Sequence, residues 1–288
     1  MSSNIHIAGV VPVSGKDLNF NFDWHDSLMP LAPDYLALER SVIECAYAGC
    51  DTVWIICNDD VTPLVRHRIG EMLEDPVWAN RNSKIASQYK RKIPIFYVPI
   101  HSKDRNRRDC LSWSVLYGAL TCFKISSSLS KWVVPKKYYI SFPYGVYDPS
   151  LVRAHRRDIL GDKNFFFCYK NQSVREGIYT SFTLNKDDFI QYRRIIRKEG
   201  TGLYINPEPG ELPSQRLPLA ERYSARNFTL DKVFKCAKLD ISNVVELPWY
   251  HSIDSWSKYC EFLSSGQRME KPNGILLPNK KWKLIGGG

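Results

Sequence analysis

Short runs of apolar residues alternate with helical patterns along the first half of the chain. The runs are rich in β-branched and aromatic side chains and are bounded by glycine, proline or polar residues, which is typical of strands buried on both faces. They cover residues 5–11, 51–57, 93–98 and 138–142. Helical patterns between them, at residues 35–48, 62–73 and 111–120, predict βαβ units with right-handed crossovers. The predicted fold class is therefore α/β, with a mainly parallel twisted sheet and helices on both faces.

The second half of the chain has a less regular pattern. Strands are predicted at residues 165–169, 178–182 and 244–247, and helices at residues 186–198, from 229 onwards and at 254–262. Residues 201–218 are rich in proline and glycine, which predicts an irregular excursion. We expect a core at residues 1–200, this excursion at 201–218, a return to the core at 219–265, and an irregular tail or arm at 266–288.

Charge adds a preference for polyanions to this picture. The chain has 40 Lys and Arg against 30 Asp and Glu, a formal net charge of +10, which favours nucleotides, nucleic acid or phosphorylated partners. Part of the excess lies at residues 101–108, which follow a predicted strand and are expected to form a basic loop. A solvated basic face is the alternative interpretation. No nucleic-acid-binding motif accompanies the charge.

Composition also bears on where the protein acts. No apolar run approaches the ~18 residues needed to cross a bilayer, and the N-terminus lacks the basic segment and apolar run of a secretory signal. The eight cysteines include no Cys-x-x-Cys spacing and lie mostly in apolar segments, so we expect free, mostly buried thiols. These features predict a cytoplasmic protein of a reducing compartment, without a membrane partner.

The first predicted strand delivers a loop that suits a phosphate group. Its apolar run breaks into Pro12-Val13-Ser14-Gly15-Lys16. A loop of glycine and serine after a buried strand exposes backbone N–H groups, and Lys16 adds a cation for a polyphosphate. The loop is not a Walker motif, because Asp17 follows Lys16 and the glycine spacing is too short. An ordinary connection with a solvated lysine is the alternative.

Both ends of the chain resemble the GT-A-like nucleotidyltransferase superfamily. The opening strand and glycine loop, with Asp26-Ser27-Leu28-Met29-Pro30-Leu31, resemble its signature loop and its lysine-x-leucine-leucine-proline stretch. The helix that ends at Gly49-Cys50-Asp51, before the strand at 53–57, is similar to the superfamily's continuation. His251 to Tyr259 resemble a segment whose Asp helps to hold the catalytic metal. Among members, the chain most resembles nucleotidyltransferases of T4-like tailed phages of marine bacteria.

The resemblance implies a set of site residues. Lys16, Arg105 and Arg108 would be the catalytic cations, with Arg107 beside them. The backbone of Gly9, Val11, Ser14 and Gly15 would hold the nucleotide, and Asp148 and Asp254 would share a Mg²⁺ ion.

Departures from the pattern concern the cations and the metal ligand. Asp26 stands where the superfamily usually has a lysine, and the glycine loop lacks the customary arginine. Phe142-Pro143-Tyr144-Gly145 stands where a Gly-Asp metal ligand is expected.

Two functions from different classes follow from these features. One is a Mg²⁺-dependent nucleotidyltransferase that joins a nucleoside triphosphate to a phosphorylated small molecule, such as a sugar phosphate, and releases pyrophosphate. The other is a catalytically degenerate member of the same fold, a binding or structural protein such as a virion or assembly component. Its protein partners would dock through the proline-rich excursion and the C-terminal tail. A related glycosyltransferase is a third interpretation, although no Asp-x-Asp motif follows a predicted strand.

Overall fold

The computed structural model describes residues 6–15, 25–79, 91–108, 110–199, 228–272 and 276–277. Within these residues one sheet has nine strands, and its centre is parallel. In spatial order the strands are β11 (Val244–Glu246), β9 (Phe166–Cys168), β10 (Phe182–Asn185), β7 (Lys137–Ile140), β1 (Ile7–Pro12), β4 (Thr52–Ile56), β6 (Lys92–Val98), β5 (Met72–Glu74) and β13 (Leu276–Leu277). The prediction that the four apolar runs of the first half share one sheet is confirmed, since they form β1, β4, β6 and β7.

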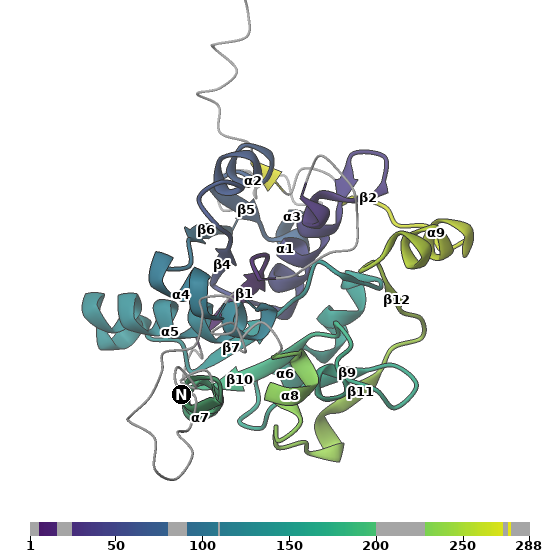
Figure 1. The fold of residues 1–288 in the computed structure, drawn as a ribbon. Helices are drawn as coiled ribbons and strands as arrows, with labels where there is room; N and C mark the ends of the chain where they lie inside the picture. Colours follow the sequence, from purple (N-terminus) through teal and green to yellow (C-terminus); the bar gives the residue numbers. More distant parts are fainter. Residues whose placement is uncertain are drawn as a thin grey trace, which may run out of the picture.

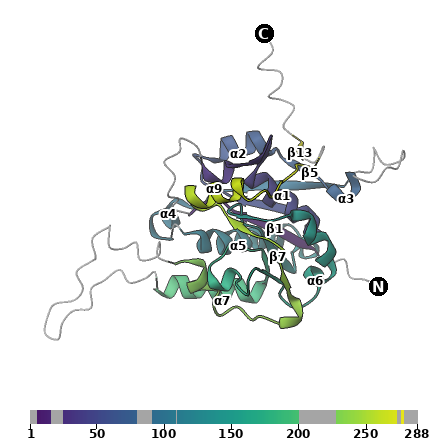
Figure 2. The same ribbon diagram turned by 90° about the vertical axis from the view of Figure 1, so that its right-hand side faces the viewer.

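Helices cover both faces of this sheet, as predicted. The α-helices are α1 (Ala37–Ala48), α2 (Thr62–Ile69), α3 (Pro76–Ala79), α4 (Ser102–Arg108), α5 (Leu111–Leu129), α6 (Arg156–Leu160), α7 (Lys186–Glu199), α8 (Leu230–Phe234) and α9 (Trp256–Ser264). Short 3₁₀ helices are η1 (Asp26–Leu28), η2 (Lys131–Val133), η3 (Pro149–His155), η4 (Val174–Glu176) and η6 (Ile241–Asn243). Figures 1 and 2 both show α1 and α5 on opposite sides of β1.

The two faces have separate hydrophobic cores because side chains alternate along each strand. Ile7 and Val11 of β1 lie in the core that contains α1, whereas Ala8 and Val10 lie in the core that contains α5. Every residue of β1 is buried. A strand covered on both sides has no polar face, which explains why its sequence is a continuous apolar run.

Beyond its parallel centre the sheet is mixed. Strand β10 is antiparallel to β7 and to β9, β11 is parallel to β9, and β5 is antiparallel to β6. The strand predicted at residues 178–182 overlaps β10 only at Phe182, so that prediction was wrong in position. Tyr179 instead packs against Phe142 and Tyr144, with ring centroids 6.0 and 5.8 Å apart. The aromatic side chain that suggested a strand in this stretch therefore packs in the core, and most of the stretch does not pair in the sheet.

Two local predictions are corrected near the strand ends. The expected basic loop contains helix α4, whose first turn is closed by the carbonyl of His101, which accepts from the N–H groups of Asp104 (2.8 Å) and Arg105 (3.1 Å). Helix α1 begins at Ala37 rather than at residue 35, because β2 (Pro30–Ala32) and β3 (Tyr35–Leu36) form a hairpin there, with Asp34 at a φ of 55°.

A two-stranded antiparallel ladder lies outside the main sheet. It pairs β8 (Gly145–Val146), which follows β7, with β12 (His251–Ser252). The ladder brings residues near 251 to the exit of a central strand, and the functional site depends on this contact.

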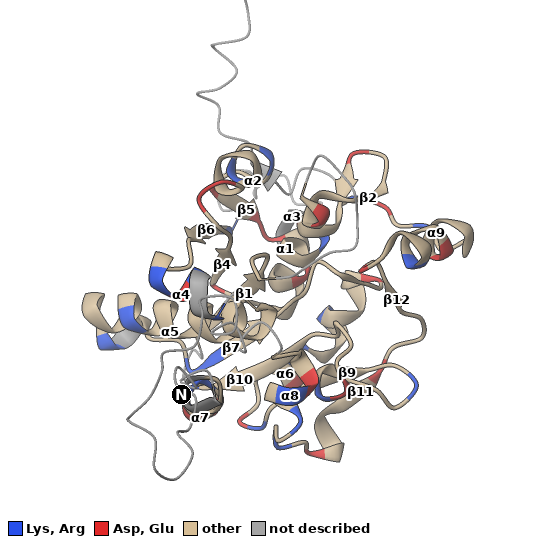
Figure 3. Ribbon diagram, viewed as in Figure 1, with Lys and Arg blue, Asp and Glu red and all other residues tan. Residues whose placement is uncertain are grey.

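The eight cysteines are free, and six of them are buried, as predicted. Lys and Arg are interspersed with Asp and Glu on several helices, including α8 and α9 (Figure 3). Among the described residues, no helix is both long and apolar enough to cross a bilayer.

The division of the chain into core, excursion, return and tail stays a prediction. Residues 201–218 and most of the tail lie outside the described residues.

A buried ion pair within α1 is hydrogen-bonded to β7 and to the residues that follow it. Arg40 and Glu44 have no exposed side-chain surface, and their guanidinium and carboxylate groups are 2.7 Å apart. The Glu44 carboxylate also accepts hydrogen bonds from the hydroxyls of Tyr139 (2.6 Å), Ser141 (2.7 Å) and Tyr147 (2.6 Å). Both lone-pair-bearing oxygens of the carboxylate are therefore satisfied by partners from β7 and the residues that follow it.

Replacing Glu44 with Gln tests this arrangement. The change keeps the shape but leaves the buried Arg40 guanidinium without a counter-charge, so the free energy of unfolding should fall by about 3–5 kcal/mol. Urea unfolding measures it. Glu71→Gln is the control, because Glu71 pairs with Arg66 in a half-exposed pair and should lose less than about 1 kcal/mol. Equal losses in the two variants would contradict the role of burial.

Candidate functional site

The carboxyl ends of β1, β4, β6 and β7 meet at one edge of the sheet. In open α/β sheets ligands bind outside this edge, between the loops that leave the strands. The described loops here are residues 13–15, 57–61, 99–101 and 141–144. Residues of a functional site are therefore expected at this carboxyl edge.

The loop after β1 turns across the end of β4. The N–H groups of Val13 and Ser14 both donate to the Ile56 carbonyl, at 2.9 and 3.0 Å. The Ser114 hydroxyl of α5 donates to the Ser14 carbonyl at 2.5 Å. Gly15 then adopts a φ of +85° directly against the backbone of Cys110. The loop thus rests on the N-terminal end of α5, and the N–H groups of Val13 and Ser14 are occupied by the Ile56 carbonyl.

Gly9 and Val11 lie inside β1 rather than at its exit. Gly9 stands opposite Val53 of β4 and Tyr139 of β7, and Val11 opposite Ile55. A Cβ atom at Gly9 would lie 2.7 Å from the Cys45 sulfur, so the glycine allows α1 to approach the sheet. The predicted contact of these two residues with a nucleotide has no support from this placement, because neighbouring strands and α1 enclose them.

The exit of β7 is tied to the loop after β1. The Tyr144 hydroxyl donates to the Val13 carbonyl at 2.9 Å, and the Ser141 N–H donates to the Val10 carbonyl at 3.1 Å. Tyr144 is fully buried. Burial raises its pKa well above the usual value for tyrosine, and the negative charge of Asp26 raises it further. Asp26 therefore acts directly on the exit of β7.

Asp254 approaches the same tyrosine from the C-terminal side. The N–H of Ile253 donates to the Tyr144 carbonyl at 2.9 Å, so the next residue, Asp254, follows at the end of the β8–β12 ladder. Burial raises the pKa of Tyr179, and the charge and hydrogen bond of Asp254 raise it further. The Lys258 ammonium also pairs with Asp254 at 2.9 Å. The charge of Asp26 therefore acts on Tyr144, and that of Asp254 on Tyr179, the ring packed beside it.

Asp148 and Asp254 lie beyond opposite ends of the ladder. His251 stands opposite Val146, so continuing the register by two residues brings Asp148 toward Trp249, whereas Asp254 follows β12 at its other end. That the two carboxylates share one ion stays a prediction. Among the described residues, no group of three or more His, Cys, Asp or Glu side chains is arranged to hold a metal ion.

Two of the predicted cations lie on α4. The Arg105 guanidinium pairs with Asp59, at the exit of β4, at 2.6 Å and donates to the Ile100 carbonyl at 2.9 Å. Arg108 pairs with Asp104 at 2.7 Å and lies 5.0 Å from the centre of the Trp113 ring. Arg105 is therefore at the carboxyl edge. Lys16 and the side chain of Arg107 lie outside the described residues, so the prediction that the arginines and Lys16 share one cleft stays a prediction.

His25 and Asp26 were not among the predicted site residues. Burial lowers the pKa of His25, and the charge of Asp60 at the exit of β4 opposes that shift. The signal for Asp26 was present in the sequence, because it replaces the lysine of the resembled motif. The position of His25 and Asp26 in the fold depends on the tertiary structure, which the sequence pattern does not show.

Comparisons with known proteins support the fold. No family model matches the chain, and no curated protein does. A UDP-glucose pyrophosphorylase in complex with UDP-glucose superposes with a TM-score of 0.51 at 11% identity, over 91% of this chain and 98% of that one. A candidate glucose-1-phosphate thymidylyltransferase from Bacillus anthracis, in complex with a sucrose, gives 0.50 at 8% identity, over 92% and 98%.

These likenesses show that the chain has the fold of nucleotide-diphospho-sugar transferases, as the sequence resemblance implies. Function must be argued from the site, because one fold hosts many activities. Neither structure bears on the resemblance to phage-encoded members, which stays a prediction.

Gly15→Ala tests the packing of the loop after β1 on α5. An alanine there would be strained by its positive φ, and its Cβ would lie 2.5 Å from the Cys110 backbone. Gly266→Ala is a matched control, since Gly266 has a φ of +73° and nothing within 4 Å of the added atom. The control should cost about 1–2 kcal/mol of unfolding free energy, and Gly15→Ala about 1–3 kcal/mol more. Equal costs by urea unfolding would show that the loop does not rest on α5.

Proposed function

We propose that this protein is a nucleotidyltransferase that joins a nucleoside triphosphate to a sugar phosphate and releases pyrophosphate. The carrying observation is that the Gly15 loop and Arg105 lie at the carboxyl edge, while Asp26 and Asp254 lie within electrostatic range of Tyr144 and Tyr179, which pack against each other beside the exit of β7. The likeness to enzymes described as making nucleotide-sugars supports the choice of substrate.

The reaction needs positioning and charge neutralisation more than covalent help from the protein. An oxygen of the sugar phosphate attacks the α-phosphorus, the bond from that phosphorus to the bridging oxygen breaks, and pyrophosphate leaves with the electron pair. Lys16 and the loop N–H groups from Gly15 onwards would bind the triphosphate. Arg105 and Arg108 would neutralise developing charge. Ser14 would act through its position in the turn, since its N–H is used by Ile56.

A divalent metal ion, Mg²⁺ in this proposal, fits the carboxylates of Asp26 and Asp254. Carboxylate oxygens are its preferred ligands, and one or two of them with phosphates and water suffice. Asp26 is buried and the Asp254 carboxylate contacts Tyr179, which limits water around both. When bound, the ion would supply charge neutralisation for the phosphates.

Asp254→Asn tests the proposed function. The change removes one negative charge with little change of shape, so Mg²⁺-dependent nucleotide binding should weaken at least tenfold, about 1.4 kcal/mol, and pyrophosphate release should be lost. Titration calorimetry with the common nucleoside triphosphates, with and without Mg²⁺, measures binding, and a coupled assay with a panel of sugar phosphates measures release.

Asp26→Asn should behave like Asp254→Asn, whereas Asp148→Asn should keep the Mg²⁺ dependence of the wild-type protein, because Asp148 is at the far end of the ladder. Loss in Asp148→Asn but not in Asp26→Asn would restore the metal pair expected from the sequence. Absence of any Mg²⁺-dependent nucleotide binding by the wild-type protein would remove the proposed function.

A catalytically degenerate binding or structural protein is the second candidate. The observation in its favour is the exit of β7, where Phe142 and Pro143 stand in place of a metal carboxylate, and the Phe142 carbonyl accepts from Arg40 at 2.6 Å instead. In this alternative the excursion and the tail would contact protein partners in a virion or another assembly. Both segments lie outside the described residues. The enzyme would act in the cytoplasm, and the structural protein in the assembled particle.

A further inference from the structure

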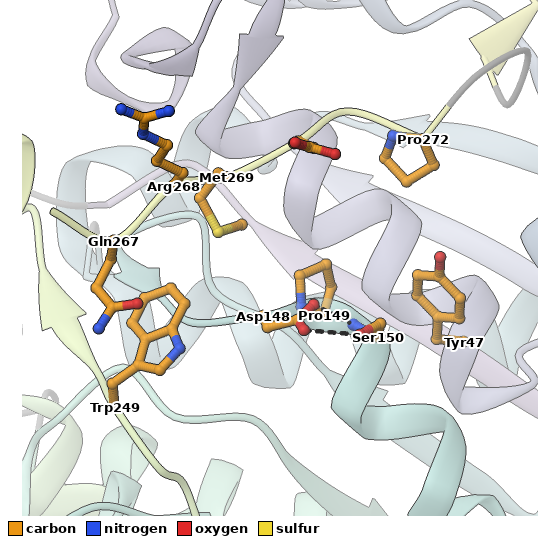
Figure 4. A pocket seen from close by; sticks show the side chains of 10 residues that line it. Tyr47, Asp148, Pro149, Ser150, Trp249, Gln267, Arg268, Met269 and Pro272 are labelled. Atoms are coloured by element: carbon orange, nitrogen blue, oxygen red, sulfur yellow. Dashed lines mark hydrogen bonds between the residues drawn. The ribbon is translucent and has the colours of Figure 1, made fainter.

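A cavity of about 310 Å³ lies beside α1, away from the carboxyl edge. Four parts of the chain line it: Tyr47 in the last turn of α1, residues 148–150 at the start of η3, Trp249 between β11 and β12, and residues 267–270 with Pro272 after α9. Figure 4 shows the side chains of these segments around the cavity. Its volume holds roughly ten groups of the size of water, about one hexose ring with its hydroxyls.

One polar group of the wall is fixed before any ligand arrives. Asp148 accepts from the Ser150 N–H at 2.9 Å through one oxygen and from the Ser150 hydroxyl at 2.7 Å through the other. Figure 4 shows this contact within the cavity wall. These bonds hold the carboxylate in one orientation and leave further lone pairs as acceptors. A preoriented acceptor loses little freedom when a ligand hydroxyl binds to it.

The C-terminal wall is also held in place. The Lys271 ammonium pairs with Glu39 at 3.1 Å and donates to the Asp34 carbonyl at 2.9 Å. Met269 is only 7% exposed and belongs to the core that contains α1. These contacts anchor the segment that carries Gln267 and Glu270 against α1. The cavity is therefore largely preformed, as small-molecule sites usually are.

The wall combines aromatic rings with planar polar groups. Trp249 and Tyr47 supply rings, and Gln267, Arg268 and Glu270 add an amide, a guanidinium and a carboxylate to that of Asp148. Burial raises the pKa of Tyr47, and the charge of Asp148 raises it further, which places the two groups near each other. The lining thus offers both hydrogen-bond donors and acceptors next to apolar ring faces.

This mixture disfavours two classes of ligand. A phosphate or carboxylate would meet the carboxylates of Asp148 and Glu270. A purely apolar ligand would leave the polar side chains without partners, which is unfavourable. A neutral polyhydroxylated ring matches all of them, because each hydroxyl both donates and accepts and the ring's C–H face packs on an aromatic side chain.

We propose that this cavity is a binding site for a neutral sugar, distinct from the carboxyl edge. Trp249 supplies the stacking face, and Asp148 supplies the preoriented acceptor for a sugar hydroxyl. The site does not depend on the proposed transferase activity, since the register of the β8–β12 ladder separates Asp148 from Asp254.

Binding of neutral sugars in the absence of nucleotide and metal tests the proposal. The probes are glucose, galactose, mannose, sucrose and maltose, with tetramethylammonium and inorganic phosphate as charged comparators. Ligand-observed NMR and titration calorimetry at millimolar concentrations should show saturable binding of at least one sugar to the wild-type protein. Trp249→Ala should weaken it at least tenfold and Asp148→Asn severalfold, while Trp249→Phe should keep most of it. Asn at position 148 can still cap η3, so that variant is expected to fold.

Trp256→Ala is the matched control, because Trp256 is a half-exposed tryptophan of α9 outside the cavity wall, and it should change sugar affinity less than twofold. If Trp249→Ala unfolds by circular dichroism, Asp148→Asn decides. The proposal is overturned if no sugar binds saturably, if neither Trp249→Ala nor Asp148→Asn weakens binding, or if a charged comparator binds more tightly than every sugar. None of these results bears on the proposed function, which is measured with nucleotide and Mg²⁺.

Discussion

The buried ion pair between Arg40 and Glu44 is the interaction on which the rest of the structure depends. Removing two charges from water costs several kcal/mol for each ion, and the attraction between them compensates only if their remaining hydrogen-bonding groups also find partners. Here those partners are hydroxyls of Tyr139, Ser141 and Tyr147. The cost is therefore offset only when α1, β7 and the residues after β7 are in place together, so the pair selects one arrangement of the three.

This constraint explains why the exit of β7 differs from the pattern that the sequence resemblance implies. The Phe142 carbonyl is held by Arg40 on one side of the sheet edge. Two residues later, Tyr144 reaches the Val13 carbonyl through its hydroxyl, and its own carbonyl accepts from Ile253. A charge buried beneath the sheet edge thereby fixes the backbone that positions Asp254. The carboxylates of the edge come from η1 and from the residues after β12 rather than from the strand exit itself.

The sequence predicts the centre of the fold well because buried parallel strands require continuous apolar runs, as at residues 5–11 and 51–57. It does not show where Asp148 and Asp254 lie relative to each other, since both follow strand signals but nothing local reveals the antiparallel pairing of β8 with β12. That pairing joins segments about a hundred residues apart and sets their separation. Helix α4 was missed for a different reason: its many charges suggested a loop, although an Asp104–Arg108 pair one turn apart supports a helix.

The short β8–β12 ladder owes its position to anchors on both sides of β8. A two-residue ladder has few hydrogen bonds of its own, and an isolated pair of strands is marginal in water. Tyr144 before β8 is bonded to the loop after β1, and Tyr147 after β8 is bonded to Glu44. With β8 pinned at both ends, β12 takes its position from β8. Asp254, two residues beyond one end of β12, then follows the Ile253–Tyr144 hydrogen bond, while Trp249, two residues before the other end, lies in the cavity wall with Asp148. Asp148 and Asp254 have similar sequence signals, but the position of this ladder gives them chemically different surroundings.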